Sequence, residues 1–153
     1  MDNFDRHILE LMQADVSLSV GEIAERVALS KTACWRRIQK LEEAGVIRAK
    51  VALLNPEALD LALTVYVSIR TNQHNEAWAS QFGAVIDQIP EVLEVYRMSG
   101  DLDYLLKAVV NDMAGYDRLY KKLIEADLFD VSSSFVMETM KQTTALPLDS
   151  IRR

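Results

Sequence analysis

Apolar residues recur at the spacing of an α-helix through the first fifty residues. In residues 3–14, one helical face carries the apolar residues Phe4, Ile8, Leu11 and Met12. Either Asp2 or Asn3 can cap the start of this segment, because a short polar side chain can accept a hydrogen bond from a free backbone N–H. We therefore predict a first helix over residues 3–14.

Two further helical segments follow, each after a capping serine. Ser19 and Glu22 have the spacing of a capping box and predict a second helix, whose inward residues are Val20, Ile23, Ala24 and Val27. Ser30 can cap a third helix that ends at Gly45, and its apolar stripe is Cys34, Ile38 and Leu41. Three short helices joined by tight turns are expected.

The second half of the chain changes to strand patterns. Residues 62–71 alternate strictly between apolar and polar side chains, which predicts a half-buried strand. The remaining patterns predict helices at 75–89 and 113–125 and strands at 92–98, 103–111 and 131–142. The order βαββαβ is typical of a ferredoxin-like α/β sandwich, with four antiparallel strands and both helices on one face.

Between the two halves, residues 46–54 are β-prone and Asn55-Pro56 closes them with a turn. The predicted fold class is therefore α+β. Its predicted divisions are a helix-turn-helix domain over 1–50, a hinge or linker over 51–61, and the α/β domain over 62–153.

Charge is distributed unevenly along the chain. The 153 residues carry a net charge of −6, which argues against contact with nucleic acid. Residues 1–50, however, are balanced at eight basic and eight acidic side chains, so the deficit lies in 51–153. Within residues 30–50, six basic side chains face only two acidic ones. A local positive patch on an acidic protein is expected.

The third predicted helix carries that patch on the face opposite its apolar stripe. Cations and hydrogen-bonding groups together on one exposed face are what a DNA recognition helix requires. A plain solvated helix is the alternative, but the capped helix and tight turn before it favour recognition. The predicted DNA-binding residues are Ser30, Lys31, Thr32, Trp35, Arg36, Arg37 and Lys40.

Two residues of this helix have alternative interpretations. Trp35 lies at the edge of the apolar stripe, so it can pack on the first helix, pack on a dimer partner, or contact the DNA backbone. Cys34 is interpreted as a small core residue rather than as a reactive thiol.

The turn Ser99-Gly100-Asp101-Leu102-Asp103-Tyr104 is the most unusual stretch of the second half. Two carboxylates can serve acid–base catalysis, but no nucleophile, metal ligands or phosphate loop stand nearby in the sequence, so an enzyme is not expected. A plain hairpin turn is one alternative. The other is a ligand site, in which carboxylates and free backbone groups hold the ammonium and carboxylate of an amino acid.

Other chemistry and other compartments are not expected. One cysteine and two distant histidines supply neither a disulfide nor a zinc site, and no cofactor is predicted. The sequence has no run of 18 apolar residues and no signal peptide at its start, so we expect a cytoplasmic protein without membrane contact.

Together these segments resemble the Lrp/AsnC family of bacterial and archaeal transcriptional regulators, the leucine-responsive and asparagine-responsive proteins. In the first half the resemblance rests on Asp5-Arg6, Ile8-Leu9, the stretch from Ser30 to Ile38, the stretch from Leu41 to Ile47, and Ala52 to Pro56. In the second half it rests on the stretch from Ser99 to Leu106, on Val136-Met137-Glu138 and on Lys141. These co-ordered motifs span nearly the whole chain.

The resemblance implies a winged helix-turn-helix joined by a β-strand hinge to an effector-binding and oligomerisation domain. It also implies homodimers that assemble further, commonly to octamers, that bind double-stranded DNA, and that bind a small amino-acid effector between dimers. Two alternatives remain. One is a ligand-independent architectural DNA-binding protein, and the other is an enzyme or stand-alone amino-acid-binding module whose N-terminal helices only contact protein. The effector residues that the resemblance implies are Gly100, Asp101, Asp103, Met113, Ser134 and Val136.

Two positions depart from the family pattern. Many members have proline where Ala33 stands, so Ser30 must cap the third helix without it. Residues 126–130 replace a Pro-Gly turn that commonly precedes the last strand, which affects oligomer packing or effector choice.

Overall fold

The computed structural model describes residues 1–150, which form two compact units. The first contains Met1–Leu53 and the chain from Lys141 onward, and the second is Leu54–Met140. Each unit has its own cluster of buried apolar side chains. The α+β fold class predicted from the sequence is confirmed.

Three helices make up most of the first unit: α1 (Asn3–Ala14), α2 (Val20–Arg26) and α3 (Lys31–Glu43). Each begins at a capping side chain that the sequence predicted, namely Asp2, Ser19 and Ser30. The tight turn after α2 places Ala28 at a φ of 55°, and Gly45 ends α3 at a φ of 69°. The predicted helix-turn-helix is confirmed.

The core of the first unit forms where the apolar faces of its three helices meet. Ile8 and Cys34 are fully buried there, together with Ile23, Ile38 and Leu41. Burial raises the pKa of the Cys34 thiol above its ordinary value, because a thiolate would lose its hydration in this core. Cys34 is a core residue, as the sequence predicted.

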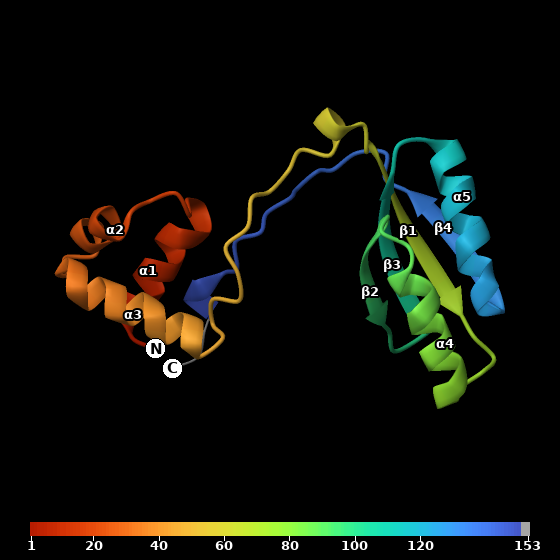
Figure 1. The fold of residues 1–153 in the computed structure, drawn as a ribbon, viewed down its shortest axis with the longest axis horizontal. Helices are drawn as coiled ribbons and strands as arrows, with labels where there is room; N and C mark the ends of the chain where they lie inside the picture. Colours follow the sequence, from red (N-terminus) through yellow and green to blue (C-terminus); the bar gives the residue numbers. More distant parts are fainter. Residues whose placement is uncertain (151–153) are drawn as a thin grey trace. The chain divides into compact units, whose positions relative to one another are not determined.

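The second unit is a four-stranded sheet with two helices (Figure 1). Its elements in chain order are β1 (Leu63–Arg70), α4 (Glu76–Asp87), β2 (Val92–Arg97), β3 (Tyr104–Val110), α5 (Met113–Leu123) and β4 (Asp130–Phe135). The strand order is β2-β3-β1-β4 and every pair is antiparallel. Both helices cover the same face of the sheet, as the βαββαβ pattern predicted (Figure 1).

Alternation along the strands decides which side chains enter this second core. Val65, Val67 and Ile69 of β1 are fully buried, whereas Tyr66 points to the opposite face and is exposed. The rings of Trp78 and Phe82 stack at 5.0 Å between centroids, and Tyr104 packs against both. The other face of the sheet has no helix over it within residues 1–150 (Figure 1).

Two segments differ from the strands predicted for them. Residues 46–54 form no strand, because within residues 1–150 this stretch has no neighbouring strand to receive its hydrogen bonds. Residues 48–62 are exposed. The segment 131–142 is a strand only as far as Phe135, which pairs with Val65 near the start of β1. Beyond Val136 the segment pairs with no strand of the described residues 1–150.

Three short 3-10 turns complete the described chain: Glu57–Leu59, Ile124–Ala126 and Leu148–Ser150. The last of them departs from the predicted domain division, which assigned residues 141–150 to the second domain. Leu148 is buried in the core cluster of the first unit instead. The contact is between residues far apart in sequence, so local periodicity carries no signal for it.

Candidate functional site

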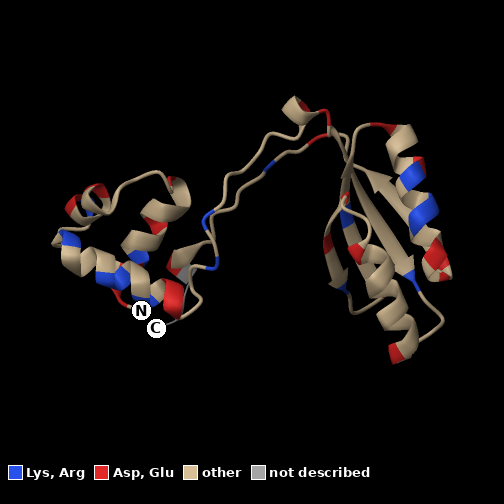
Figure 2. Ribbon diagram, in the orientation of Figure 1, with Lys and Arg blue, Asp and Glu red and all other residues tan. Residues whose placement is uncertain are grey.

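The exposed face of α3 carries the predicted cations. Lys31, Arg36 and Lys40 are exposed, and within residues 1–150 none of them makes an ion pair. Figure 2 shows basic residues at several points along α3 from its first turn onward. Thr32 is exposed beside them, so donors and positive charge share one accessible surface. Such a surface matches the phosphates and base edges of a DNA groove.

Trp35 is 52% exposed on the same helix. It does not belong to the buried cluster of the first unit. An indole left half in solvent on a cationic face is available to DNA or to another copy of the chain.

Arg37 differs from its neighbours because two carboxylates hold its guanidinium. Its Nη1 lies 2.8 Å from both Asp2 Oδ2 and Asp5 Oδ1, and its Cζ lies 5.3 Å from the centre of the Phe4 ring. The hydrogen bond to Asp5 and then that to Asp2 raise the pKa of Arg37. Arg37 thereby ties α3 to the first turn of α1, a contact that sequence reasoning missed.

Ser30 positions the first turn of α3. Its Oγ accepts a hydrogen bond of 3.2 Å from the backbone N–H of Ala33. A proline at position 33, which many family members carry, has no N–H to donate. This chain therefore caps the helix by a hydrogen bond where proline would restrict the backbone.

The turn between β2 and β3 holds three of the six predicted effector residues. Gly100 has a φ of 110°, a conformation that L side chains rarely adopt, and Asp101 is exposed. Asp103 has a structural partner: its Oδ2 accepts a hydrogen bond of 2.8 Å from the backbone N–H of Thr71. Its own N–H donates to the carbonyl of Ile69 at 3.0 Å. Asp103 thus joins the turn to the end of β1.

The other three predicted effector residues lie at the opposite end of the sheet. Met113 opens α5 and is exposed, Ser134 pairs with Tyr66, and the N–H of Val136 donates to the carbonyl of Thr64. From Thr64 to Thr71 an extended strand spans about 23 Å at 3.3 Å per residue. One copy of the chain therefore does not bring the six residues together.

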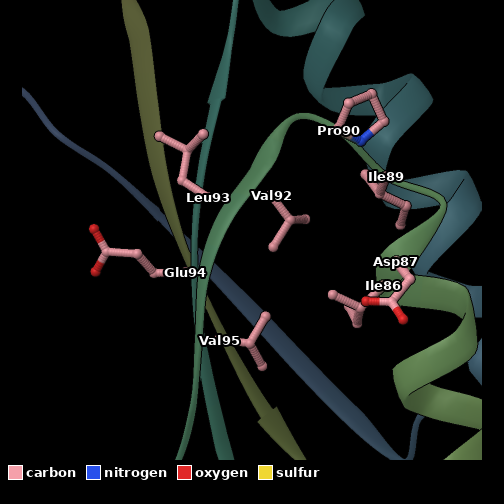
Figure 3. Close-up of a pocket in the computed structure, with 8 residues that line it drawn as sticks. All are labelled: Ile86, Asp87, Ile89, Pro90, Val92, Leu93, Glu94 and Val95. Atoms are coloured by element: carbon pink, nitrogen blue, oxygen red, sulfur yellow. The ribbon is translucent and has the colours of Figure 1, made fainter. Parts of the chain in front are cut away.

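Two hollows lie on the second unit. One, of about 260 Å³, adjoins the β2–β3 turn and includes Asp103, with Trp78 and Tyr104 among its apolar walls and Arg97 among its charged ones. The other, of about 330 Å³, lies between the end of α4 and the edge strand β2. In Figure 3, Val92 and Val95 point toward the α4 side of this second hollow, and Glu94 points away. None of the predicted effector residues lines it.

Within residues 1–150, no group of three His, Cys, Asp or Glu side chains is placed to hold a metal ion. The same residues contain no helix that is both long and apolar enough to cross a bilayer.

Comparisons with known proteins assign a family to both units. A model described as "Winged helix-turn-helix DNA-binding" matches residues 1–48, and one described as "Lrp/AsnC ligand binding domain" matches residues 64–146. The chain is 45% identical over 151 residues to the DNA-binding transcriptional activator DecR of Escherichia coli K12. That alignment covers 97% of this chain and 99% of DecR.

Solved structures agree in fold over nearly the whole chain. An AsnC family transcriptional regulator from Agrobacterium tumefaciens is 54% identical, with a TM-score of 0.92 over 97% of this chain and 98% of that one. A transcriptional regulator from Neisseria meningitidis, solved in complex with L-Met, is 35% identical, with a TM-score of 0.91 over 97% of each chain. The chain thus belongs to the Lrp/AsnC family and is a DNA-binding transcriptional regulator with a ligand-binding domain.

Proposed function

We propose that the chain acts as a homodimer that places two α3 helices in successive major grooves, roughly 34 Å apart, on a pseudo-palindromic site. The observation that carries this proposal is the set of exposed cations on α3 that make no ion pair with any residue of 1–150, namely Lys31, Arg36 and Lys40. Ser30, Thr32 and Trp35 complete the contact surface. Arg37 acts differently, because its charge is balanced by Asp2 and Asp5: it holds the recognition helix in position on α1.

We further propose that a small amino acid binds between dimers and changes DNA affinity or assembly. The relative that was solved with L-Met supports this class of ligand. The proposed site combines Gly100, Asp101 and Asp103 of one copy with Met113, Ser134 and Val136 of another. The distance between the two groups within one chain supports a site that needs two copies, and assembly beyond the dimer, commonly to an octamer, supplies them.

Replacing Arg36 tests the DNA interface. Arg36→Ala removes one phosphate contact, so we expect weaker binding to DNA selected by the wild-type protein. We also expect the slope of log affinity against log salt to flatten by about one unit. Electrophoretic mobility shift or fluorescence anisotropy over a salt series measures both. Arg118→Ala, an exposed arginine of α5, is the matched control and should leave the slope unchanged. An unchanged slope for Arg36→Ala contradicts the interface.

Thermal shift with each of the twenty amino acids tests the ligand class. A ligand that binds only the folded protein raises its melting temperature, by mass action. The same amino acid should then alter DNA affinity in the mobility-shift assay. DNA binding without any thermal shift would instead indicate an architectural protein that needs no ligand.

A further inference from the structure

The last described residues return to the DNA-binding unit and are clamped there by one side chain. Gln13, near the end of α1, donates from Nε2 to the carbonyl of Leu146 at 3.2 Å, and its Oε1 accepts from the N–H of Leu146 at 2.7 Å. The amide of Gln13 thus satisfies both backbone groups of one residue, as a neighbouring strand would. This contact joins positions 133 residues apart in the sequence.

A buried side chain follows the clamp. Leu148 is 9% exposed and belongs to the same apolar cluster as Ile8 and Ile38. The side chain of Leu146 is 69% exposed, so this residue is held by its backbone and Leu148 by its side chain. Pro147 stands between them and restricts φ to about −65°, which lowers the entropy lost on docking. Leu148 also lies outside the two family matches, which cover 1–48 and 64–146.

This docking gives the two units a second and shorter connection, which runs along the chain and ends in non-covalent contacts. The first runs from Ile47, packed on the first core, to Leu63 at the start of β1, and its sixteen residues span at most about 55 Å when fully extended. The second runs from Phe135 at the end of β4 to Leu146, and its eleven residues span at most about 38 Å. While Leu146 is clamped, the second connection limits the separation of these attachment points.

We infer that residues 141–150 are a strap: they complete the DNA-binding unit and tether it to the sheet edge formed by β4. The inference rests on the proposed function in one respect, that two such units bind one DNA site as a dimer. A short tether restricts how far apart the two recognition helices can reach, and so sets the half-site spacing that the dimer accepts. Ser134 and Val136, proposed for the ligand site, lie where β4 ends and the chain segment leading to the strap begins.

Amide hydrogen exchange of the full chain, without ligand or DNA, tests the docking. Leu148→Ala removes the buried anchor, so we expect the α1 amides to exchange at least about tenfold faster, because local opening becomes easier. Leu146→Ala is the matched control: it truncates an exposed side chain of the same type and keeps both backbone hydrogen bonds, so exchange should stay within about twofold of wild type. Equal behaviour of the two variants overturns the docking.

Gln13→Ala is a second variant in case Leu148→Ala folds poorly. It removes both hydrogen bonds to Leu146 and leaves the apolar core untouched. We expect faster exchange at the end of α1, smaller than for Leu148→Ala. Exchange as slow as wild type in Gln13→Ala also overturns the docking.

Half-site spacing tests the tether. On DNA selected by the wild-type protein, about five base pairs inserted between half-sites turn one recognition site to the other face of the duplex, and wild-type affinity should fall. In Leu148→Ala the preference for the original spacing should shrink at least about fivefold, since only the longer linker remains. An unchanged preference overturns the tether. If the wild-type protein shows no paired half-sites, the proposed dimer fails, while hydrogen exchange still decides whether the strap docks.

Discussion

Two adjacent arginines of α3 show how much a side chain's surroundings decide its role. Arg36 is exposed and unpaired within the described chain, so its full charge is available to phosphates. Arg37 is 30% exposed and makes two ion pairs of 2.8 Å, with the Phe4 ring against its cation. An approaching phosphate would have to compete with Asp2 and Asp5 for it. The positive surface available to DNA is therefore smaller than the count of basic residues within 30–50 implies.

The exposed face of α3 could be predicted because it follows from 100° per residue and from the apolar stripe alone. The partners of Arg37 could not, since Asp2 and Asp5 lie 35 and 32 residues away along the chain. Asp103 is a similar case, because its carboxylate bonds to the backbone of Thr71, 32 residues earlier. Long-range side-chain pairs leave no periodic signal in one sequence.

Asp101 and Asp103 should respond differently to substitution. Asp103→Ala removes the acceptor for the Thr71 N–H, and we expect a loss of about 2 kcal/mol in unfolding free energy, as is usual for hydrogen bonds to charged groups. Asp101→Ala should stay within about 0.5 kcal/mol of wild type, since Asp101 is exposed. Urea unfolding measures both values.

Asp103→Asn is the control for that comparison, because it keeps a carbonyl oxygen to accept the hydrogen bond and should recover most of the loss. In DNA-binding assays Asp101→Ala should abolish the effect of the amino acid and leave basal affinity intact. A stability loss in Asp101→Ala that equals that of Asp103→Ala would contradict this division of roles.

At the scale of elements, the helices were predictable because their start signals are local. Asp2, Ser19 and Ser30 each bond a backbone N–H three residues on, and Asp2 and Ser19 form full capping boxes. Strand ends were less predictable, since a strand continues only as far as its neighbour. Phe135 is the last paired residue of β4, and residues 46–54 pair with no strand within residues 1–150.

The capping carboxylates predict acid sensitivity of the first unit. The hydrogen bond from the backbone N–H of Asp5 lowers the pKa of Asp2, and that from Ser19 lowers the pKa of Glu22. A carboxyl group with a lowered pKa stabilises the fold fully above its unfolded value, here 3.8 and 4.5, and the gain is lost as the pH falls through the folded value. The melting temperature should therefore decline below about pH 4.5.

Glu22→Gln and Asp2→Asn test this effect, because each keeps a capping oxygen that does not titrate, although Asp2→Asn also removes the charge that pairs with Arg37. Circular dichroism melts between about pH 3 and pH 7 should show a shallower acid decline for both variants. Glu10→Gln, on an exposed position of α1, should follow the wild-type curve. If all three variants follow wild type, the acid sensitivity arises elsewhere.

At the scale of the whole molecule, mixing of subunits tests whether the ligand site is shared between two copies. The test is possible because Asp101 and Ser134 lie in the two separated groups of predicted effector residues. A site that takes Asp101 from one copy and Ser134 from another fails in assemblies of Asp101→Ala alone or of Ser134→Tyr alone. When the two variants are mixed at random, about a quarter of the sites receive both wild-type contributions. Calorimetric titration with the amino acid found by thermal shift should then measure about a quarter of the binding sites of the wild-type protein.

Ser134→Tyr unmixed and Asp101→Ala unmixed are the controls and should bind no ligand. Co-expression, or unfolding and refolding together, ensures exchange of subunits. A mixture that binds as little ligand as either variant alone would place both groups of a site on one copy, against the two-copy arrangement.

The division into two units was predictable from the change of hydrophobic period near residue 50, and the assignment of the C-terminal segment was not. Residues 141–150 carry one buried apolar side chain, Leu148, whose partners are the helices of the first unit. A single apolar residue shows no periodicity. Without a periodic signal, residues 141–150 were predicted to belong to the same domain as the strand before them.

The placement of Leu148 has a consequence for how the protein is made. Translation delivers α1, α2 and α3 first, yet a side chain of their shared core, that of Leu148, is synthesised only after the whole sheet of the second unit. The core of the DNA-binding unit is therefore completed only after the ligand-binding domain has been synthesised.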